Sequence, residues 1–332
     1  MVRLTVYALL ALGIGILGPG KLRAADVQMD DATKKATARA LEWLARKQNV
    51  DGSWSTDRYP HSTAITSFAL LAFMSQGHLP NQSLYGPEVA KGCRFLLASA
   101  RNDGYLVGAR GGNMYAHAMA TLALSELWGM TADEEIKPVL KKAVDLIVRC
   151  QNGEGGWRYD PAPTGADISV TIMQVMALRA AKNSGIFVPD ITIKKAIAYI
   201  KKLYHSPSGG FGYQSPHNPG FARSAAGVCV LQLSGQYDAK EIPKAVDYLR
   251  KNFNDSTHFW YGHYYAAHAM HQVGGNEWED WYIRIRDRLL TSQSADGSWS
   301  TRDREGVGPA YQTSIAVIIL SVPAHYLPIF QR

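Results

Sequence analysis

Two kinds of helix pattern alternate along the chain, and they differ in how many of their sides are apolar. In the first kind, apolar residues recur at helical spacing among lysines, as Ile193, Ile197 and Ile200 do among Lys194 and Lys195. Residues 139–150, 242–249 and 278–289 repeat this arrangement. A single apolar stripe predicts a helix with one face buried and the other face in water.

The second kind of stretch carries almost no charged residues. A helix that is apolar all round is buried on all sides, and an alanine-rich run of this length favours helix over strand. Six such stretches occupy residues 61–74, 115–124, 168–178, 224–234, 259–273 and 311–322. The alternation predicts an all-α fold, an α6/α6 toroid with dry helices inside wet ones. An open helical solenoid is the alternative, but it would leave one face of the charge-free helices in water.

A short segment recurs between the wet and the dry patterns. QNVDGSW, QNGEGGW and QSADGSW share a glutamine, a glycine and a tryptophan, and weaker copies end at Tyr105 and Phe211. The period of about 52 residues indicates stacked or ringed units, and a degenerate unit near Trp260 is inferred from position alone.

The chemistry of these residues favours a structural role for the repeated segment. Glycine suits a left-handed helix end, glutamine bonds backbone groups at helix ends, and tryptophan fills the gap between units. Aromatic side chains that line a ligand site are the alternative interpretation. The residues concerned are Gln48, Trp54, Gln151, Trp157, Gln293 and Trp299.

Composition and charge exclude several classes of protein. The 332-residue chain is 46% hydrophobic and only 19% charged, which excludes a disordered chain and a charge-rich coiled coil. Its formal charge is +7, but Arg3, Lys21 and Arg23 lie in the first 24 residues without any acid, which leaves +4 for the remainder. Because no cluster of basic residues stands out elsewhere, nucleic acid is not an expected partner.

The N-terminal residues have the pattern of an export signal. Arg3 precedes a largely apolar run over residues 4–17, and Ala24 and Ala25 suit a cleavage site. The run is short for a membrane-spanning helix, which needs about 20 apolar residues. We therefore expect a signal peptide over residues 1–24, one domain over residues 25–332, and a periplasmic or extracellular location. An uncleaved anchor is the alternative.

The repeated segments resemble the QW repeats of the squalene cyclase and prenyltransferase superfamily. Residues 114–130, 167–178 and 260–275 further resemble a group of exported bacterial proteins with prenyltransferase/squalene-oxidase repeats. The resemblance covers nearly all of residues 30–332 and implies an α6/α6 toroid around a central apolar cavity. It also implies an apolar, isoprenoid-like small molecule as a partner, with peripheral membrane contact as a further expectation.

The chemical motifs of the superfamily are only partly present. Its class II terpene cyclases protonate a polyene with an Asp-rich DxDD motif, and the matching place here, Ala166-Asp167-Ile168-Ser169, keeps one acid. Its protein prenyltransferases bind zinc through Asp, Cys and His, but no Asp stands two residues before Cys229. The other two cysteines lie far from it and from each other, and His258, His263, His268 and His271 cluster without a clear acidic ligand. We expect no metal and no cofactor.

Polar residues converge at one end of the dry helices. If these helices form the inner ring, their first turns point toward one mouth of the cavity and carry Thr63, Tyr115, His117, Asp167, Ser169, Arg223, Ser224, His263, Tyr264, Tyr311 and Thr313. The candidate catalytic residues are Asp167 as the acid, with Tyr115 and His117. The candidate substrate-binding residues are Arg223, Tyr261, His263, Tyr264 and Tyr311.

Each of these assignments has a structural alternative. Asp167 before Ile168 is a plausible helix N-cap, and His117 could be a buried histidine with local hydrogen-bond partners. A glycosidase needs two carboxylates facing across a cleft, and Asp167 is the only acid among these positions. Two hypotheses remain: an enzyme acting on an isoprenoid, as an isomerase or transferase, or a non-catalytic module that binds an apolar ligand or serves as a protein-interaction scaffold.

Overall fold

The computed structural model describes residues 27–301 and 305–331, and the described chain is helical. The proposed signal peptide lies outside the described residues. Six amphipathic helices are α1 (Asp31–Arg46), α3 (Gly86–Ala98), α5 (Ile136–Arg149), α7 (Asp190–Lys202), α9 (Ile242–Lys251) and α11 (Gly275–Ser292). The six helices that alternate with them are α2 (Thr63–Met74), α4 (Met114–Thr131), α6 (Ile168–Asn183), α8 (Phe221–Leu233), α10 (Phe259–Val273) and α12 (Pro309–Leu320).

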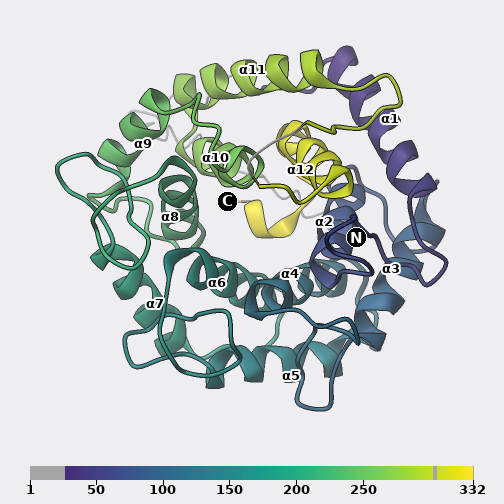
Figure 1. Ribbon diagram of the computed structural model, residues 1–332, viewed down its shortest axis with the longest axis horizontal. Coiled ribbons are helices and arrows are strands. Elements are labelled where there is room, and N and C mark those ends of the chain that lie inside the picture. Colours follow the sequence, from purple (N-terminus) through teal and green to yellow (C-terminus); the bar gives the residue numbers. More distant parts are fainter. Residues whose placement is uncertain (1–26, 302–304, 332) are drawn as a thin grey trace, which may run out of the picture.

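The even-numbered helices form a closed inner ring (Figure 1). Each contacts the next even-numbered helix in order, and α12 returns to pack against α2. The odd-numbered helices surround this ring, each packed against at least one neighbouring inner helix. The closure confirms the predicted α6/α6 toroid and excludes the open solenoid, whose first and last helices would not meet.

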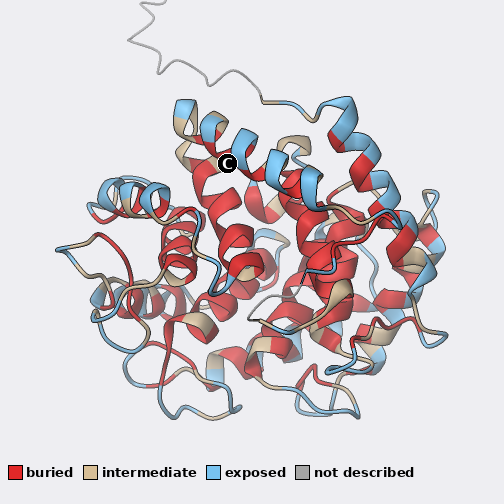
Figure 2. Cartoon of the chain, turned by 45° about the horizontal axis from the view of Figure 1, so that its top comes forward, coloured by how far each residue is buried: buried red, intermediate tan, exposed pale blue. Residues whose placement is uncertain are grey.

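Burial follows the two hydrophobic patterns (Figure 2). In α2 every residue except Ala64 is buried, whereas α9 buries only Ile242, Ala245, Val246 and Leu249. The inner helices pack against one another on two sides and against the outer ring on a third, so few of their positions carry charged residues. In the described part of the chain, no helix is both long and apolar enough to cross a membrane.

Each of the three complete repeated segments links the outer helix before it to the next outer helix around the ring. In the second copy, the indole N–H of Trp157 donates to the Ile147 carbonyl at 2.7 Å, and the Gln151 amide donates to the Thr192 carbonyl of α7 at 2.8 Å. Gly155 has φ +98°, and a Cβ there would collide with the Lys195 carbonyl, so only glycine fits. The copies at Trp54 and Trp299 make the same contacts. The α9–α10 connection lacks the segment, and Trp260 lies within α10.

The last residues fold back into the centre of the ring (Figure 1). After α12, two short 3₁₀ turns, η1 (Val322–Ala324) and η2 (Pro328–Phe330), carry the chain inward, and Leu327, Ile329 and Phe330 are buried. Since α12 begins at the end where the repeated segments lie, its C-terminus opens at the opposite end. We call residues 322–331 the C-terminal strap, which closes that end of the lumen.

Candidate functional site

A cavity of about 1130 Å³ opens at the end of the ring where the outer helices connect to the inner ones. Its walls combine the first turns of inner helices with the loops that precede them. The aromatic residues that line it are Tyr59, Phe68, Tyr115, Tyr159, Tyr213, Phe221, Tyr261 and Tyr311. We call this space the mouth cavity. The first turns of the inner helices, which the sequence predicts to converge on one mouth, therefore form part of the wall of this cavity.

Five of the predicted first-turn or substrate-binding residues line the mouth cavity: Tyr115, Ser169, Arg223, Tyr261 and Tyr311. Tyr115 and Tyr261 face each other with ring centroids 6.3 Å apart, and Tyr311 packs edge-on against Phe68 at 5.2 Å. Burial raises the pKa of Tyr115 and of Tyr311 well above the ordinary value, so both phenols are neutral. These rings form an uncharged aromatic floor.

Asp167 is the N-cap of α6 and does not line the mouth cavity. One carboxylate oxygen, Oδ1, accepts the Val170 N–H at 3.0 Å, and the side chain is fully buried. Burial raises the pKa of the Asp167 carboxyl above its usual value. The structural alternative considered for this residue thus describes its position, while its side chain reaches Tyr213, which lines the mouth cavity, and its role as an acid stays a prediction.

Both predicted site histidines also lie outside the mouth cavity. Both ring nitrogens of His117 are hydrogen-bonded: Nδ1 accepts the Leu106 N–H at 3.1 Å, and Nε2 donates to the Ala143 carbonyl at 3.2 Å. Burial lowers its pKa to about 4, which keeps the ring neutral at pH 7. His263 donates from Nε2 to the Phe253 carbonyl and lies against the ring of Trp281 of α11. Each histidine therefore tethers an inner helix to its surroundings.

Tyr264 lies one layer below the mouth cavity. Its ring packs edge-on against Phe68, with centroids 5.8 Å apart, and against Phe330 of the C-terminal strap at 6.3 Å. Tyr264, a predicted substrate-binding residue, therefore does not line the mouth cavity and lies behind Phe68, which does.

The loops add charged residues that the helix patterns could not reveal. Arg58, Arg110, Asp255 and Glu305 line the mouth cavity together with Arg223. The Glu305 carboxylate accepts the Tyr261 N–H at 3.2 Å. It therefore pairs with a free backbone N–H in the first turn of α10, where a negative charge is favourable. A signal for two of the missed aromatics exists in the sequence, because Tyr59 and Tyr159 each follow an arginine shortly after a repeated segment. The mouth is therefore amphiphilic, with an aromatic floor and a charged rim.

The four clustered histidines do not share one place. His258 lines the mouth cavity, His263 lies among aromatic rings, and His268 and His271 line a small space at the strap. Within residues 27–301 and 305–331, no group of three or more histidine, cysteine, aspartate or glutamate side chains is arranged to hold a metal ion. The three cysteines are buried and free of disulfides in the described structure.

Comparison with known proteins identifies the family. Residues 7–163 and 166–320 match the family described as prenyltransferase alpha-alpha toroid domain. The chain belongs to this family. The chain is also similar to a lanosterol synthase of Aspergillus fumigatus, with 29% identity in an alignment of 136 residues that covers 38% of this chain and 17% of the synthase. A drimenyl diphosphate synthase of Streptomyces showdoensis is 27% identical over 185 residues, 54% of this chain and 33% of that enzyme. The chain thus spans a third or less of the length of these relatives.

Solved structures with the same toroid belong to more than one class of enzyme. A type II terpene cyclase from Scytonema superposes with a TM-score of 0.61 at 14% identity, covering 90% of this chain and 98% of that one. An α-1,6-mannanase from Salegentibacter superposes with a TM-score of 0.69 at 8% identity, covering 89% and 99%. At these identities the similarity concerns only the fold of the toroid domain. Its chemistry has to be inferred from the residues described above.

Proposed function

We propose that this toroid domain binds an isoprenoid-like molecule in the mouth cavity. The observation that carries the proposal is the cavity itself, about 1130 Å³, with a floor of Phe68, Tyr115 and Tyr311. Ligand sites are typically lined by aromatic and apolar groups with a few polar groups that fix orientation. A branched apolar chain gains free energy by leaving water for such a floor.

The charged rim supports a ligand with one polar end. Three arginines, Arg58, Arg110 and Arg223, line the cavity alongside the two acids Asp255 and Glu305. An apolar chain directed at the floor would leave its polar end among these side chains. The Scytonema cyclase, whose structure contains geranylgeranyl dihydroxybenzoate as substrate, shows that a toroid of this fold accommodates such an amphiphile.

Binding is better supported than proton-transfer chemistry by Asp167. The mouth cavity includes Tyr115 but neither Asp167 nor His117, and the matching place of the DxDD motif holds a single acid. A proton donor must lie within hydrogen-bond reach of the atom it protonates. The proposed function is therefore that of a binding module, and turnover is measured in the same experiment.

The proposal is tested by ligand binding to the purified protein and to two matched variants. Ala64 lines the mouth cavity and Ala109 is exposed outside it, so Ala64→Trp fills the cavity whereas Ala109→Trp adds the same side chain elsewhere. We expect radiolabelled geranylgeraniol to bind the wild type and Ala109→Trp and to lose at least tenfold in affinity for Ala64→Trp. Equal binding by all three proteins would refute the site. Conversion of the labelled compound into product would show an enzyme.

A saccharide is a second candidate ligand because two carboxylates, Asp255 and Glu305, line the mouth cavity. Asp167 is the only acid among the first-turn positions of the inner helices, whereas Asp255 and Glu305 come from loops. Glycoside hydrolysis uses two carboxyl groups that face each other across the substrate. Binding of α-1,6-mannotriose that is lost in Ala64→Trp, without binding of geranylgeraniol, would favour this class.

We further propose that the protein is exported and that residues 1–24 are its signal peptide. The basic residue, apolar run and small residues near Ala24 support this proposal. Mass spectrometry of the protein recovered from cell fractions tests it: a soluble exported form beginning near Ala25 is the expected result. A full-length form in the membrane fraction would instead support the uncleaved anchor and a peripheral toroid.

A further inference from the structure

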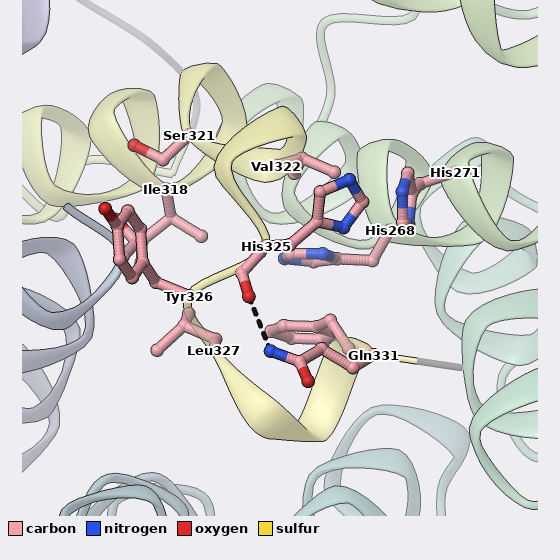
Figure 3. Close-up of a pocket in the computed structure, with 11 residues that line it drawn as sticks. His268, His271, Ile318, Ser321, Val322, His325, Tyr326, Leu327 and Gln331 are labelled. Atoms are coloured by element: carbon pink, nitrogen blue, oxygen red, sulfur yellow. Dashed lines mark hydrogen bonds between the residues drawn. The ribbon is translucent and has the colours of Figure 1, made fainter. Parts of the chain in front are cut away.

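The C-terminal strap occupies the far end of the lumen (Figure 3). The Ile329 N–H donates to Glu126 Oε2 at 3.1 Å, and the Phe330 carbonyl accepts the Gln272 amide at 2.6 Å. The ring of Phe330 stacks on His268 with centroids 3.3 Å apart. Two main-chain hydrogen bonds and a few apolar side chains thus hold the end of the chain in place. Chain ends held this way open more readily than segments between two helices.

The strap leaves polar atoms of α10 without partners. Both ring nitrogens of His268, Oε1 of Gln272 and the hydroxyl of Tyr264 have no hydrogen bond in the described structure, and each residue is at most 2% exposed. Buried polar groups are almost always paired, because an unpaired one has lost its bonds to water. A space of about 20 Å³, the size of one water molecule, lies beside His268. We call the residues that the strap covers, Glu126, Tyr264, His268 and Gln272, its seat. The strap therefore packs well against the apolar groups of its seat but leaves several of the polar atoms there without hydrogen bonds.

The seat of the strap is close to the mouth cavity. Tyr264 contacts Phe68, which lines the mouth cavity, on one side and Phe330 of the strap on the other. One aromatic layer therefore separates the two spaces, and a long chain entering from the mouth would meet the strap after passing that layer.

We propose that a ligand can displace the C-terminal strap from the lumen. The space that the strap leaves would then bind the hydroxyl-bearing end of a long apolar chain, as a second part of the ligand site. A hydroxyl both donates and accepts, so it can bond an imidazole nitrogen of His268 and Oε1 of Gln272. A carboxylate is disfavoured, because among the described residues that line the space beside His268 there is no lysine or arginine, and the strap already contacts the Glu126 carboxyl. This inference rests on the proposed function, since the chain enters through the mouth cavity.

Two fluorescent reporters on the full chain separate the strap from the mouth. Because Cys93, Cys150 and Cys229 are buried, a thiol-reactive fluorophore sensitive to its surroundings labels an added exposed cysteine selectively. Gln331→Cys reports on the strap, and Thr257→Cys reports on the rim of the mouth cavity. The probes are geranylgeraniol, the shorter geraniol, and a C20 hydrocarbon without the hydroxyl.

We expect geranylgeraniol to change the emission of both reporters and geraniol to change only the one at Thr257→Cys. His268→Leu, which replaces an unpartnered polar ring by an apolar group, should weaken the strap response to geranylgeraniol at least fivefold. His217→Leu, at an exposed histidine, should leave it unchanged. Thermal unfolding of each variant confirms that it is folded.

The possible failures point to different conclusions. A response at the mouth without any response at the strap overturns the exchange while the proposed function stands. A strap response that is equal for the hydrocarbon, or unchanged in His268→Leu, overturns recognition of the hydroxyl. If geranylgeraniol changes the emission of neither reporter, both the proposed function and this inference are overturned.

Discussion

Replacing Glu126 by glutamine should stabilise the protein, and increasingly so as the pH rises. Glu126 lies on inner helix α4 with a side chain that is almost fully buried, and its Oε2 accepts the Ile329 N–H. Burial raises the pKa of this carboxyl from 4.5 to about 8, while the bond from Ile329 acts weakly in the opposite direction. Glutamine keeps the shape and an acceptor oxygen but cannot ionise.

The magnitude follows from the difference between the folded and unfolded states. Below pH 4.5 the carboxyl is protonated in both states and contributes no penalty. Between pH 4.5 and about 8 the unfolded chain alone releases the proton, so the free energy of unfolding falls by about 1.4 kcal/mol per pH unit. The loss reaches about 3 kcal/mol at pH 7 and about 5 kcal/mol above pH 8.

The measurement is the free energy of unfolding of wild type and Glu126→Gln in urea, at half-unit steps from pH 4.5 to 9. Taking the difference at each pH cancels the titration of every group other than Glu126. We expect the difference to rise steadily over this range, around whatever constant offset the amide introduces. A difference that stays flat would show that the carboxyl is hydrated in the folded protein and that the reasoning from burial is wrong.

Three further predictions concern the frame of the toroid. Trp157→Phe should cost about 2–4 kcal/mol, because it removes the indole hydrogen bond to the Ile147 carbonyl and loses buried volume, and it should not abolish ligand binding; abolished binding at an unchanged melting temperature would contradict the structural role. Gly155→Ala should cost more than about 1 kcal/mol in urea unfolding, because of its φ of +98° and the contact with the Lys195 carbonyl, whereas Gly153→Ala, which meets nothing, is the control. The neutral His117, with a pKa of about 4 in the folded protein and 6.5 as its ordinary value, contributes stability that is complete above pH 6.5 and falls by about 3 kcal/mol as the pH drops toward 4. His117→Phe should remove that part of the acid dependence, and an unchanged slope in urea titrations would argue against it.

The sequence by itself determined the architecture, because the signals for it are local and repeated. A single apolar stripe, as in residues 190–202, and a run without charge, as in residues 259–273, reflect how many sides of a helix meet other helices. The regular return of the glutamine, glycine and tryptophan indicated equivalent turns, and equivalent turns at a constant period lead to a ring or stack. The cap at Asp167 was also visible, because N-capping depends only on the next three residues.

Tertiary structure alone decided which side chains meet the lumen. Tyr115 and His117 stand two residues apart in the same helix turn, yet one faces the mouth cavity and the other bonds the Ala143 carbonyl of α5. That choice depends on how α4 is rotated against its neighbours, which no periodicity in a helix buried on all sides can indicate. Likewise Arg58 and Glu305 reach the cavity from loops, and the strap reaches Glu126 from about 200 residues away in the chain. Such contacts arise only when the ring closes, because closure brings the ends of all inner helices around one space.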